Sequence, residues 1–261
     1  MWASIWRFRG FILANVWREF QARYRHSILG ALWNILNPLA MIVIYTVVFS
    51  QVMKARLPGV ESATAYGIFL CAGSLSWGLF SEVVSRCQTM FIDHGHLLKK
   101  IQFPKSVLPI ITVLSALMNF AIPFGLFLLY LLCFETWPGW PVLALLPVLV
   151  ILLMFASGLG LCLGVLNVFY RDVGAFFAIA LQFWFWLTPI VYPAAILPEW
   201  AHFWMDINPM APIIEAFQQV VVAQRLPDPA RLVLPAISGA VLCLLGLVLM
   251  RRHAAELVDE L

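Results

Sequence analysis

The sequence predicts an all-α integral membrane protein with six transmembrane helices, an N-terminal interfacial helix, and short helices that dip into the outer membrane surface. Hydrophobic residues make up 63% of the 261 residues and charged residues only 11%, whereas a soluble domain carries about 25% charged residues. One helical span needs about 20 apolar residues. With a mean hydropathy of +0.92, the chain 1–261 has room for about six spans in a single transmembrane domain and for no separate soluble domain.

Residues 1–26 are expected to form an amphipathic helix in the membrane surface. At about 100° per residue, its apolar side chains share one narrow face and its arginines another, which is typical of a helix whose arginines face anionic headgroups. The arginines also interrupt any apolar core of a cleavable signal. A disordered basic arm is the alternative. The apolar face holds Trp2, Trp6, Leu13, Trp17, Phe20 and Tyr24, and the basic face Arg7, Arg18 and Arg25.

Five apolar segments that can cross a bilayer follow, with a sixth near the C-terminus. The second is the least apolar, and its small and hydroxyl residues predict packing against protein rather than lipid. Gly160 and Gly164 in the fourth form a GxxxG pattern that favours a close helix crossing. Glu82 and Arg86, four residues apart, can pair at the end of the second span. The expected spans are residues 33–53, 65–84, 107–134 and 142–169, then one that starts near 175, and 232–250.

The stretch between the last two spans, residues 183–217, starts as a membrane helix and is then broken by prolines. A proline lacks the amide donor and crowds the preceding turn, so one straight helix is excluded. Irregular backbone at membrane depth survives only where protein or a wet cavity satisfies it. We therefore expect a lid over an exit path, with an interfacial loop anchored by tryptophans as the alternative. The prolines are Pro189, Pro193, Pro198, Pro209 and Pro212.

The basic residues predict the orientation. With the N-terminus in the cytoplasm, twelve of the sixteen Lys and Arg residues lie on the inside and four on the outside. This is a clear positive-inside bias. Both termini are therefore expected to be cytoplasmic, and the broken stretch faces outward. The basic groups do not interleave with polar base-reading residues, which argues against nucleic acid as a partner.

The expected source of energy lies outside this chain. The sequence has no GxxxxGK[ST] phosphate loop, and no acidic residue is expected at the bilayer midplane, where an ion-coupled carrier needs one. Another subunit must then drive transport, and the longest cytoplasmic connection, residues 91–105, would receive its force. An ordinary positive-inside loop is the alternative. The residues expected to couple are His94, His96, Leu97, Lys99 and Lys100.

Metal binding is not predicted. His94 and His96 form a possible pair of ligands, but no further ligand follows them nearby. The five cysteines are scattered singly without a CxxC pair, which supports neither a disulfide framework nor a metal cluster.

Aromatic and amide side chains of the spans form a candidate path for a sugar polymer. Sugar rings pack their C–H faces on aromatic rings, and their hydroxyls need polar partners such as amides; any one aromatic taken alone fits a packing role better. Arg171 and Asp172 are adjacent and do not face each other on a helix, so we expect each to pair elsewhere, with a stop-transfer charge pair as the alternative. The candidate path residues are Trp33, Asn34, Asn37, Tyr45, Trp77, Gln182, Trp184, Trp186 and Tyr192.

Four segments make the sequence resemble a known family. They are RYRHSILGALWNILNPL (23–39), NVFYRDV (167–173), FWLTPIVYP (185–193) and INPM (207–210). They resemble the marks of ABC-2 type permeases that export polysaccharides, above all the membrane subunit of O-antigen and teichoic-acid exporters. The resemblance covers nearly the whole chain.

The resemblance implies a bacterial inner-membrane homodimer above two separate ABC ATPase subunits, which bind ATP and Mg. It implies an interfacial helix (2–24), a cytoplasmic coupling helix (92–102, within 91–105) and periplasmic re-entrant gate helices (198–225, within 194–226). The implied cargo is a polysaccharide on a polyprenyl pyrophosphate lipid, whose pyrophosphate the arginines of the interfacial helix would attract. Those arginines are Arg18, Arg23 and Arg25.

Other readings stay open. The same architecture serves capsule or teichoic-acid export, or a small molecule or drug. A membrane-embedded transferase would need an acidic or histidine cluster at one membrane face, but the acids are dispersed singly. A secondary carrier conflicts with the apolar span centres. No added sugar-recognition domain is present, so selection of a glycan end group would reside in the partner.

Overall fold

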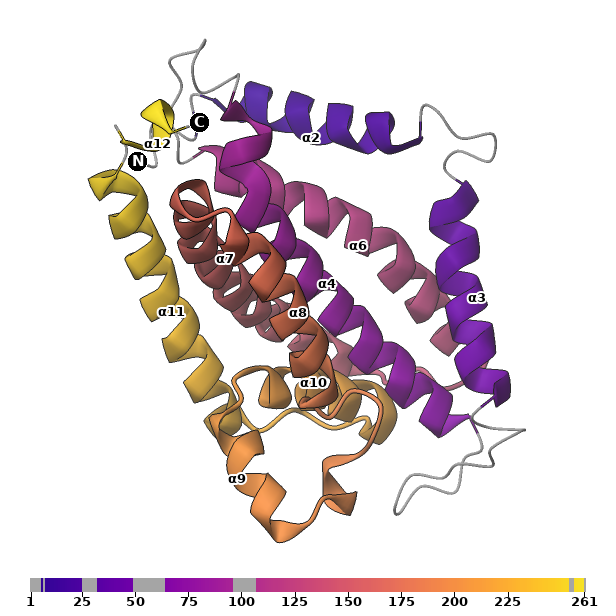
Figure 1. The fold of residues 1–261 in the computed structure, drawn as a ribbon. Helices are drawn as coiled ribbons and strands as arrows, with labels where there is room; N and C mark the ends of the chain where they lie inside the picture. Colours follow the sequence, from indigo (N-terminus) through magenta and orange to yellow (C-terminus); the bar gives the residue numbers. More distant parts are fainter. Residues whose placement is uncertain are drawn as a thin grey trace.

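The computed structural model describes residues 6, 8–24, 32–48, 64–95, 107–253 and 256–260, and within these ranges it contains helices, turns and irregular segments without a strand. Figure 1 shows a bundle of steep helices with one helix lying across one end and short helices at the other. The helices are α2 (Arg9–Tyr24), α3 (Trp33–Val47), α4 (Ala65–Asp93), α6 (Val107–Cys133), η3 (Trp140–Ala144), α7 (Leu145–Phe169), α8 (Asp172–Trp186), η4 (Ala194–Ile196), α9 (Glu199–Ile207), α10 (Met210–Gln218), η5 (Gln219–Ala223), α11 (Pro229–Arg252) and α12 (Glu256–Asp259).

Four of these helices are long and apolar enough to cross a membrane. They comprise α4, α6, η3 continued by α7, and α11. The expected first and fifth spans correspond to α3 and α8, which have 15 residues each and are shorter than the roughly 20 residues of a full span. α8 ends at Trp186 because Pro189 follows. The expected end of the first span, Met53, lies outside the described residues.

The second span is longer than the sequence analysis predicted. Its expected end near Val84 is wrong, because α4 continues to Asp93. Residues 85–93 contain no proline or glycine, so nothing interrupts the helix there. With 29 residues, α4 is about 43 Å long, against about 30 Å for the hydrocarbon core. Glu82 and Arg86 consequently lie within α4 rather than at its end.

The core forms where α4, α7 and α11 pack together. α4 is the most buried of the four long helices, which agrees with the prediction that it packs against protein. α7 crosses it at the GxxxG pair. A Cβ atom on Gly160 would stand 2.5 Å from Cys87 Cβ, and one on Gly164 2.5 Å from the Cys87 carbonyl oxygen. The two glycines therefore allow the backbones of α4 and α7 to approach closely, as predicted.

Helix α2 lies across the end of the bundle, at the same end as α12 and opposite α9 (Figure 1). Its apolar residues Leu13 and Trp17 are exposed, as is Trp6 just before the helix, whereas Ile12 and Val16 are buried against the bundle. An exposed apolar face at the end of a bundle is suited to the membrane surface. The N-terminal and C-terminal flanks of α2, residues 1–5, 7 and 25–31, lie outside the described residues.

Gly164→Ala is expected to lower the stability of the bundle by about 1–3 kcal/mol, because the new methyl group would overlap the backbone of α4. Gly125→Ala is the matched control: no atom lies within 4 Å of a Cβ at this position of α6, and alanine favours a helix over glycine. The midpoint of thermal unfolding in detergent measures both. Equal midpoints for the two variants would contradict the close crossing.

Candidate functional site

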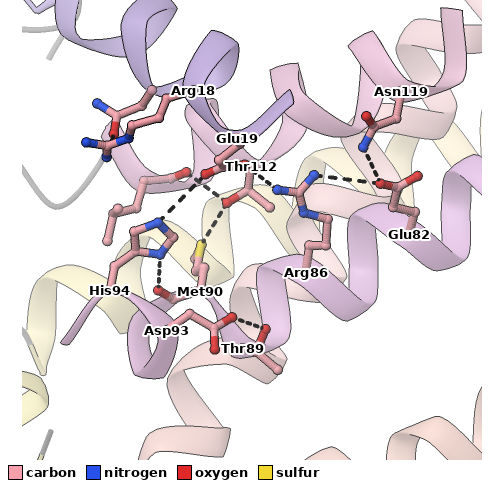
Figure 2. A network of polar contacts seen from close by, with 12 residues as sticks. Arg18, Glu19, Glu82, Arg86, Thr89, Met90, Asp93, His94, Thr112 and Asn119 are labelled. Atoms are coloured by element: carbon pink, nitrogen blue, oxygen red, sulfur yellow. Dashed lines mark hydrogen bonds and ion pairs between the residues drawn. The ribbon is translucent and has the colours of Figure 1, made fainter. Parts of the chain in front are cut away.

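The candidate site lies where α2 meets α4 and α6. Residues 12, 16 and 19 recur at helical spacing on one face of α2. Ile12 and Val16 are buried by the bundle, so Glu19 on the same face points toward α4. Helices α2, α4 and α6 thus bring charged and polar side chains together at the end of the bundle (Figure 2).

Arg86 joins two carboxylates across this junction. Its Nη2 donates a hydrogen bond to Glu19 Oε2 of α2, and its Nη1 lies 3.6 Å from Glu82 Oε1, one turn earlier on α4. Asn119 Nδ2 of α6 donates to the same Glu82 oxygen at 2.8 Å (Figure 2). The predicted pairing of Glu82 with Arg86 is confirmed, but it is one link in a chain of contacts from α2 through α4 to α6.

His94, directly after α4, also faces Glu19. Its Nδ1 lies 2.9 Å from the Met90 carbonyl oxygen, which only accepts hydrogen bonds, so Nδ1 carries a proton. Its Nε2 lies 3.8 Å from Glu19 Oε1 (Figure 2). A neutral ring would turn a lone pair toward the carboxylate, whereas an imidazolium attracts it. The contact with Glu19 accordingly raises the pKa of His94, against the opposing effect of burial.

Glu19 stays ionised in this setting. Burial by itself would raise the pKa of its carboxyl, but His94, Ser115 and Arg86 outweigh burial and bring the pKa down to about 2. Glu19 therefore keeps its negative charge at neutral pH. The charge is what holds Arg86 and His94 together.

A cavity of about 480 Å³ opens beside this cluster. The buried Ser115 Oγ, near Glu19, reaches normal hydrogen-bond geometry to no described residue. The cavity combines charged walls with apolar ones, as expected at the level of the lipid headgroups. Its lining comprises Val16, Glu19, Phe20, Ala22, Arg86, His94, Ser115 and Asn119.

The structure places only part of the predicted coupling segment. His94 lies in the cluster, whereas His96, Leu97, Lys99 and Lys100 lie outside the described residues. The cluster thus ends where the remainder of residues 91–105 begins. Within the described ranges, no three His, Cys, Asp or Glu side chains are grouped to hold a metal ion.

Glu19 was not predicted as a site residue, because the sequence of α2 was interpreted as a helix of arginines and aromatic residues. A signal was available, because an acid three residues after Val16 continues the buried face of the helix. Of the predicted pyrophosphate-binding arginines, Arg18 is exposed and donates to Asn15 Oδ1 at 2.6 Å. The side chain of Arg23 and all of Arg25 lie outside the described part of the chain.

The candidate path residues fall into an exposed and a buried group. Asn37 of α3 and Gln182 and Trp186 of α8 are exposed. Trp77 is only 7% exposed and meets Trp184 edge to face, with ring centroids 6.1 Å apart, so it packs inside the bundle. Tyr45, Trp184 and Tyr192 are half-buried, and the side chains of Trp33 and Asn34 lie outside the described residues.

Helices α3 and α8 do not adjoin each other within one chain. α3 packs on α4 and α6, whereas α8 packs on α7 and α4, so α4 stands between them (Figure 1). Both present apolar side chains outward, among them Val43 and Ile44 of α3 and Phe176 and Phe183 of α8. A path flanked by both helices is therefore incomplete within a single copy of the chain.

Arg171 and Asp172 begin α8 and are both exposed. Asp172 lies in the first turn of the helix, where a negative charge is favourable. Neither side chain forms an ion pair with another residue of the described ranges, so the expectation of separate partners stays a prediction. The turn itself is held by Asn167, whose Oδ1 accepts from the Gly174 amide at 3.0 Å.

These features define a multi-pass helical membrane protein whose surface helix is tied to a long spanning helix by charged groups. The sequence pattern of the ABC-2 type transporter matches residues 11–222, and the chain belongs to this family of membrane transporters. Its members act as the permease subunits of ABC transporters and are not themselves catalytic.

Relatives with a described role resemble the chain over most of its length. An O-antigen export system permease protein RfbA from Myxococcus xanthus is 32% identical over 241 residues, which cover 92% of this chain and 90% of the relative. A protein of the same description from Klebsiella pneumoniae is 27% identical over 90% of this chain and 88% of the relative. The polysialic acid transport protein KpsM of Escherichia coli is 23% identical over 93% of each chain.

The attachment of α2 is expected to weaken as the pH rises. The pKa of His94 is raised above its ordinary value of 6.5, so its contribution is complete below that value and is lost as the pH passes the raised pKa. Glu19, whose pKa is lowered from 4.5 to about 2, keeps its full contribution above about pH 4.5 and loses it as the pH falls toward 2. Hydrogen exchange of the α2 amides should therefore accelerate from about pH 6 to 9 beyond the intrinsic pH effect.

His94→Gln should remove this excess acceleration, because glutamine does not titrate. Glu19→Gln should release α2 at every pH, at a cost of about 1–2 kcal/mol for the lost charged hydrogen bonds. Glu256→Gln is the control, since Glu256 pairs with His253 and has no contact with the Glu19–Arg86–His94 cluster among the described interactions. An unchanged pH profile in His94→Gln would contradict the role of the imidazolium.

Proposed function

We propose that this chain is the membrane-spanning subunit of an ATP-driven exporter that moves a lipid-linked, O-antigen-like polysaccharide across the bacterial inner membrane. The observation that carries the proposal is its 32% identity to an O-antigen export permease over 92% of this chain. The absence of a phosphate loop from the sequence supports ATP hydrolysis in a separate ABC ATPase, which would bind ATP and Mg. Both termini would then face the cytoplasm.

The conduit in this proposal forms between two copies of the chain. Support comes from α3 and α8, whose outward faces flank α4 on different sides. The exposed Asn37, Gln182 and Trp186 would meet sugar hydroxyls and ring faces in the assembled dimer. α3 and α8, extended by neighbouring residues, would complete six spans, and α9 with α10 would act as the outer gate.

Force would reach the permease through residues 91–105, pushed by the ATPase. The Glu19–Arg86–His94 cluster supports this route, because His94 stands at the start of the segment and contacts α2. A push on the segment would be felt by α2, beside which the pyrophosphate of the lipid would bind near Arg18, Arg23 and Arg25.

Capsule export is the second candidate. It is favoured by the 23% identity to a polysialic acid transport protein over 93% of this chain. The higher identity to the O-antigen permeases places it second. Teichoic acid and small molecules or drugs are weaker alternatives, because the relatives described above are exporters of O-antigen or polysialic acid.

Removal of the gene tests the cargo. Lipid-linked glycan should accumulate in the cytoplasmic leaflet, and the surface should lose the polymer, because synthesis continues without export. Mass spectrometry of the extracted lipids identifies the carrier and the sugars. A tagged chain purified from its native host should also bring an ABC ATPase with it in equal amounts. Purification of the chain alone, with an unchanged surface glycan, would contradict the proposal.

Lys99→Glu combined with Lys100→Glu should separate ATP hydrolysis from export. Reversed charges on the coupling segment would disturb docking of the ATPase while leaving the spans intact. Lys99→Arg with Lys100→Arg is the control, since it keeps both charges. ATPase activity and surface glycan are measured in the same cells. Full export by the glutamate variant would remove these lysines from the coupling role.

A further inference from the structure

Two of the sequence segments that carry the family resemblance meet at the outer end of the bundle. One is the broken end of α8, residues 187–191. The other is the turn around Asn208, which separates α9 from α10. Because α8 stops before Pro189, the last carbonyl groups of the helix have no partner within it. Thr188 and Ile190 are fully buried, so these groups need partners from the protein.

Asn208 binds both segments at once. Its Oδ1 accepts from Trp184 Nε1 of α8 at 2.9 Å and from the Met210 amide that begins α10 at 3.0 Å. Its Nδ2 donates to Thr188 Oγ1 at 3.0 Å and to the Leu187 carbonyl oxygen at 3.4 Å.

The chemistry of the partners leaves one orientation for this amide. An indole N–H and a backbone N–H only donate, and a carbonyl only accepts. The Trp184 and Met210 contacts can therefore be made only by the Asn208 oxygen, and the Leu187 contact only by its nitrogen. Thr188 Oγ1 in turn donates to the Trp184 carbonyl oxygen at 2.8 Å, which frees its lone pairs for Asn208.

The rest of the broken segment is held by α10 and α4. Gln218 Nε2 of α10 lies 3.1 Å from the Pro189 carbonyl oxygen and 3.4 Å from that of Ile190. Tyr66 of α4 donates to the Val191 carbonyl oxygen at 2.8 Å. A Cβ on Gly73 of α4 would lie 2.8 Å from Gln218 Nε2. The absence of a side chain at Gly73 therefore leaves room for Gln218 to bind the Pro189 and Ile190 carbonyl oxygens.

We propose that Asn208 is a positioning residue that makes the end of α8 and the start of α10 move as one body. A residue that only starts α10 would need the Met210 contact alone; the other three contacts of Asn208 go to Trp184 of α8 and to Leu187 and Thr188, which directly follow that helix. α10 is largely buried, whereas α9 exposes Trp200, Phe203 and Trp204. Asn208 directly follows the C-terminal end of the exposed helix α9. In the proposed exporter, which this inference deepens, a shift of α8 would carry α9 and α10 with it.

The test leaves Asn208 in place and removes its partners on α8. Trp184→Phe with Thr188→Val keeps the aromatic packing and the side-chain shape but deletes the indole donor and the hydroxyl. The contact of Asn208 with the Met210 amide is untouched. Trp140→Phe with Thr136→Val is the matched control: Trp140 is 69% exposed and both lie in the segment before α7.

Hydrogen exchange of the purified chain in lipid nanodiscs is the first measurement. Loss of the two links should raise exchange by about tenfold both at residues 187–191 and at residues 208–214, because each segment loses contacts that hold it to the other. The control should match the wild type. Faster exchange at 187–191 alone, with 208–214 unchanged, would overturn the proposal.

Asn208→Asp provides a second variant. Aspartate retains an acceptor for Trp184 and for the Met210 amide, but it turns an oxygen toward the Leu187 carbonyl and loses the donor. It should raise exchange at 187–191 and lower export per ATP hydrolysed, measured with the ATPase partner, whereas unchanged exchange at 187–191 would overturn the proposal. If the wild type exports no glycan, the proposed function fails and the exchange data still decide the role of Asn208.

Discussion

Backbone groups freed at the end of a buried helix must find partners in the protein, and this constraint organises the end of the molecule that carries α9 and α10. Prolines end α8 early, which leaves the carbonyl groups of Leu187, Pro189 and Ile190 without partners in the helix, and Pro189 and Ile190 are buried. The chain satisfies them with amide side chains of Asn208 and Gln218. The break in the helix is thereby compatible with a buried position, and the same bonds fix the short outer helices to the bundle.

A different interaction acts at the opposite end of the molecule, where α2 lies. There the charges of Glu19, Arg86 and His94 attach α2, which has little apolar surface to bury against the bundle because its Trp and Leu side chains face outward. Partly exposed ion pairs contribute modestly to stability. An attachment of this kind is weak enough to rearrange.

The sequence predicted the positions of most helices but few of the contacts between them. Long apolar runs and prolines predicted where most helices lie, and Gly160 and Gly164 predicted the crossing of α4 and α7. The early stop of α8 shows where length arguments fail, since α8 has 15 residues. Glu19 was recoverable from its spacing to Val16. The role of Asn208 was not, because its partners Thr188 and Trp184 lie 20 and 24 residues away across a broken segment.

Both ends of the molecule are attached to the same helix. Arg86 near one end of α4 holds α2; near the other end, Tyr66 holds the break after α8 and Gly73 leaves room for Gln218. α4 is a continuous helix of 29 residues without an internal proline, and it is buried along most of its length, so it resists bending. A displacement at the Glu19–Arg86–His94 cluster would then also shift the contacts at Tyr66 and Gly73, because α4 would move as one rigid element. Communication between the two faces would depend on the tilt or shift of α4, with the side-chain contacts at each end converting that motion into opening.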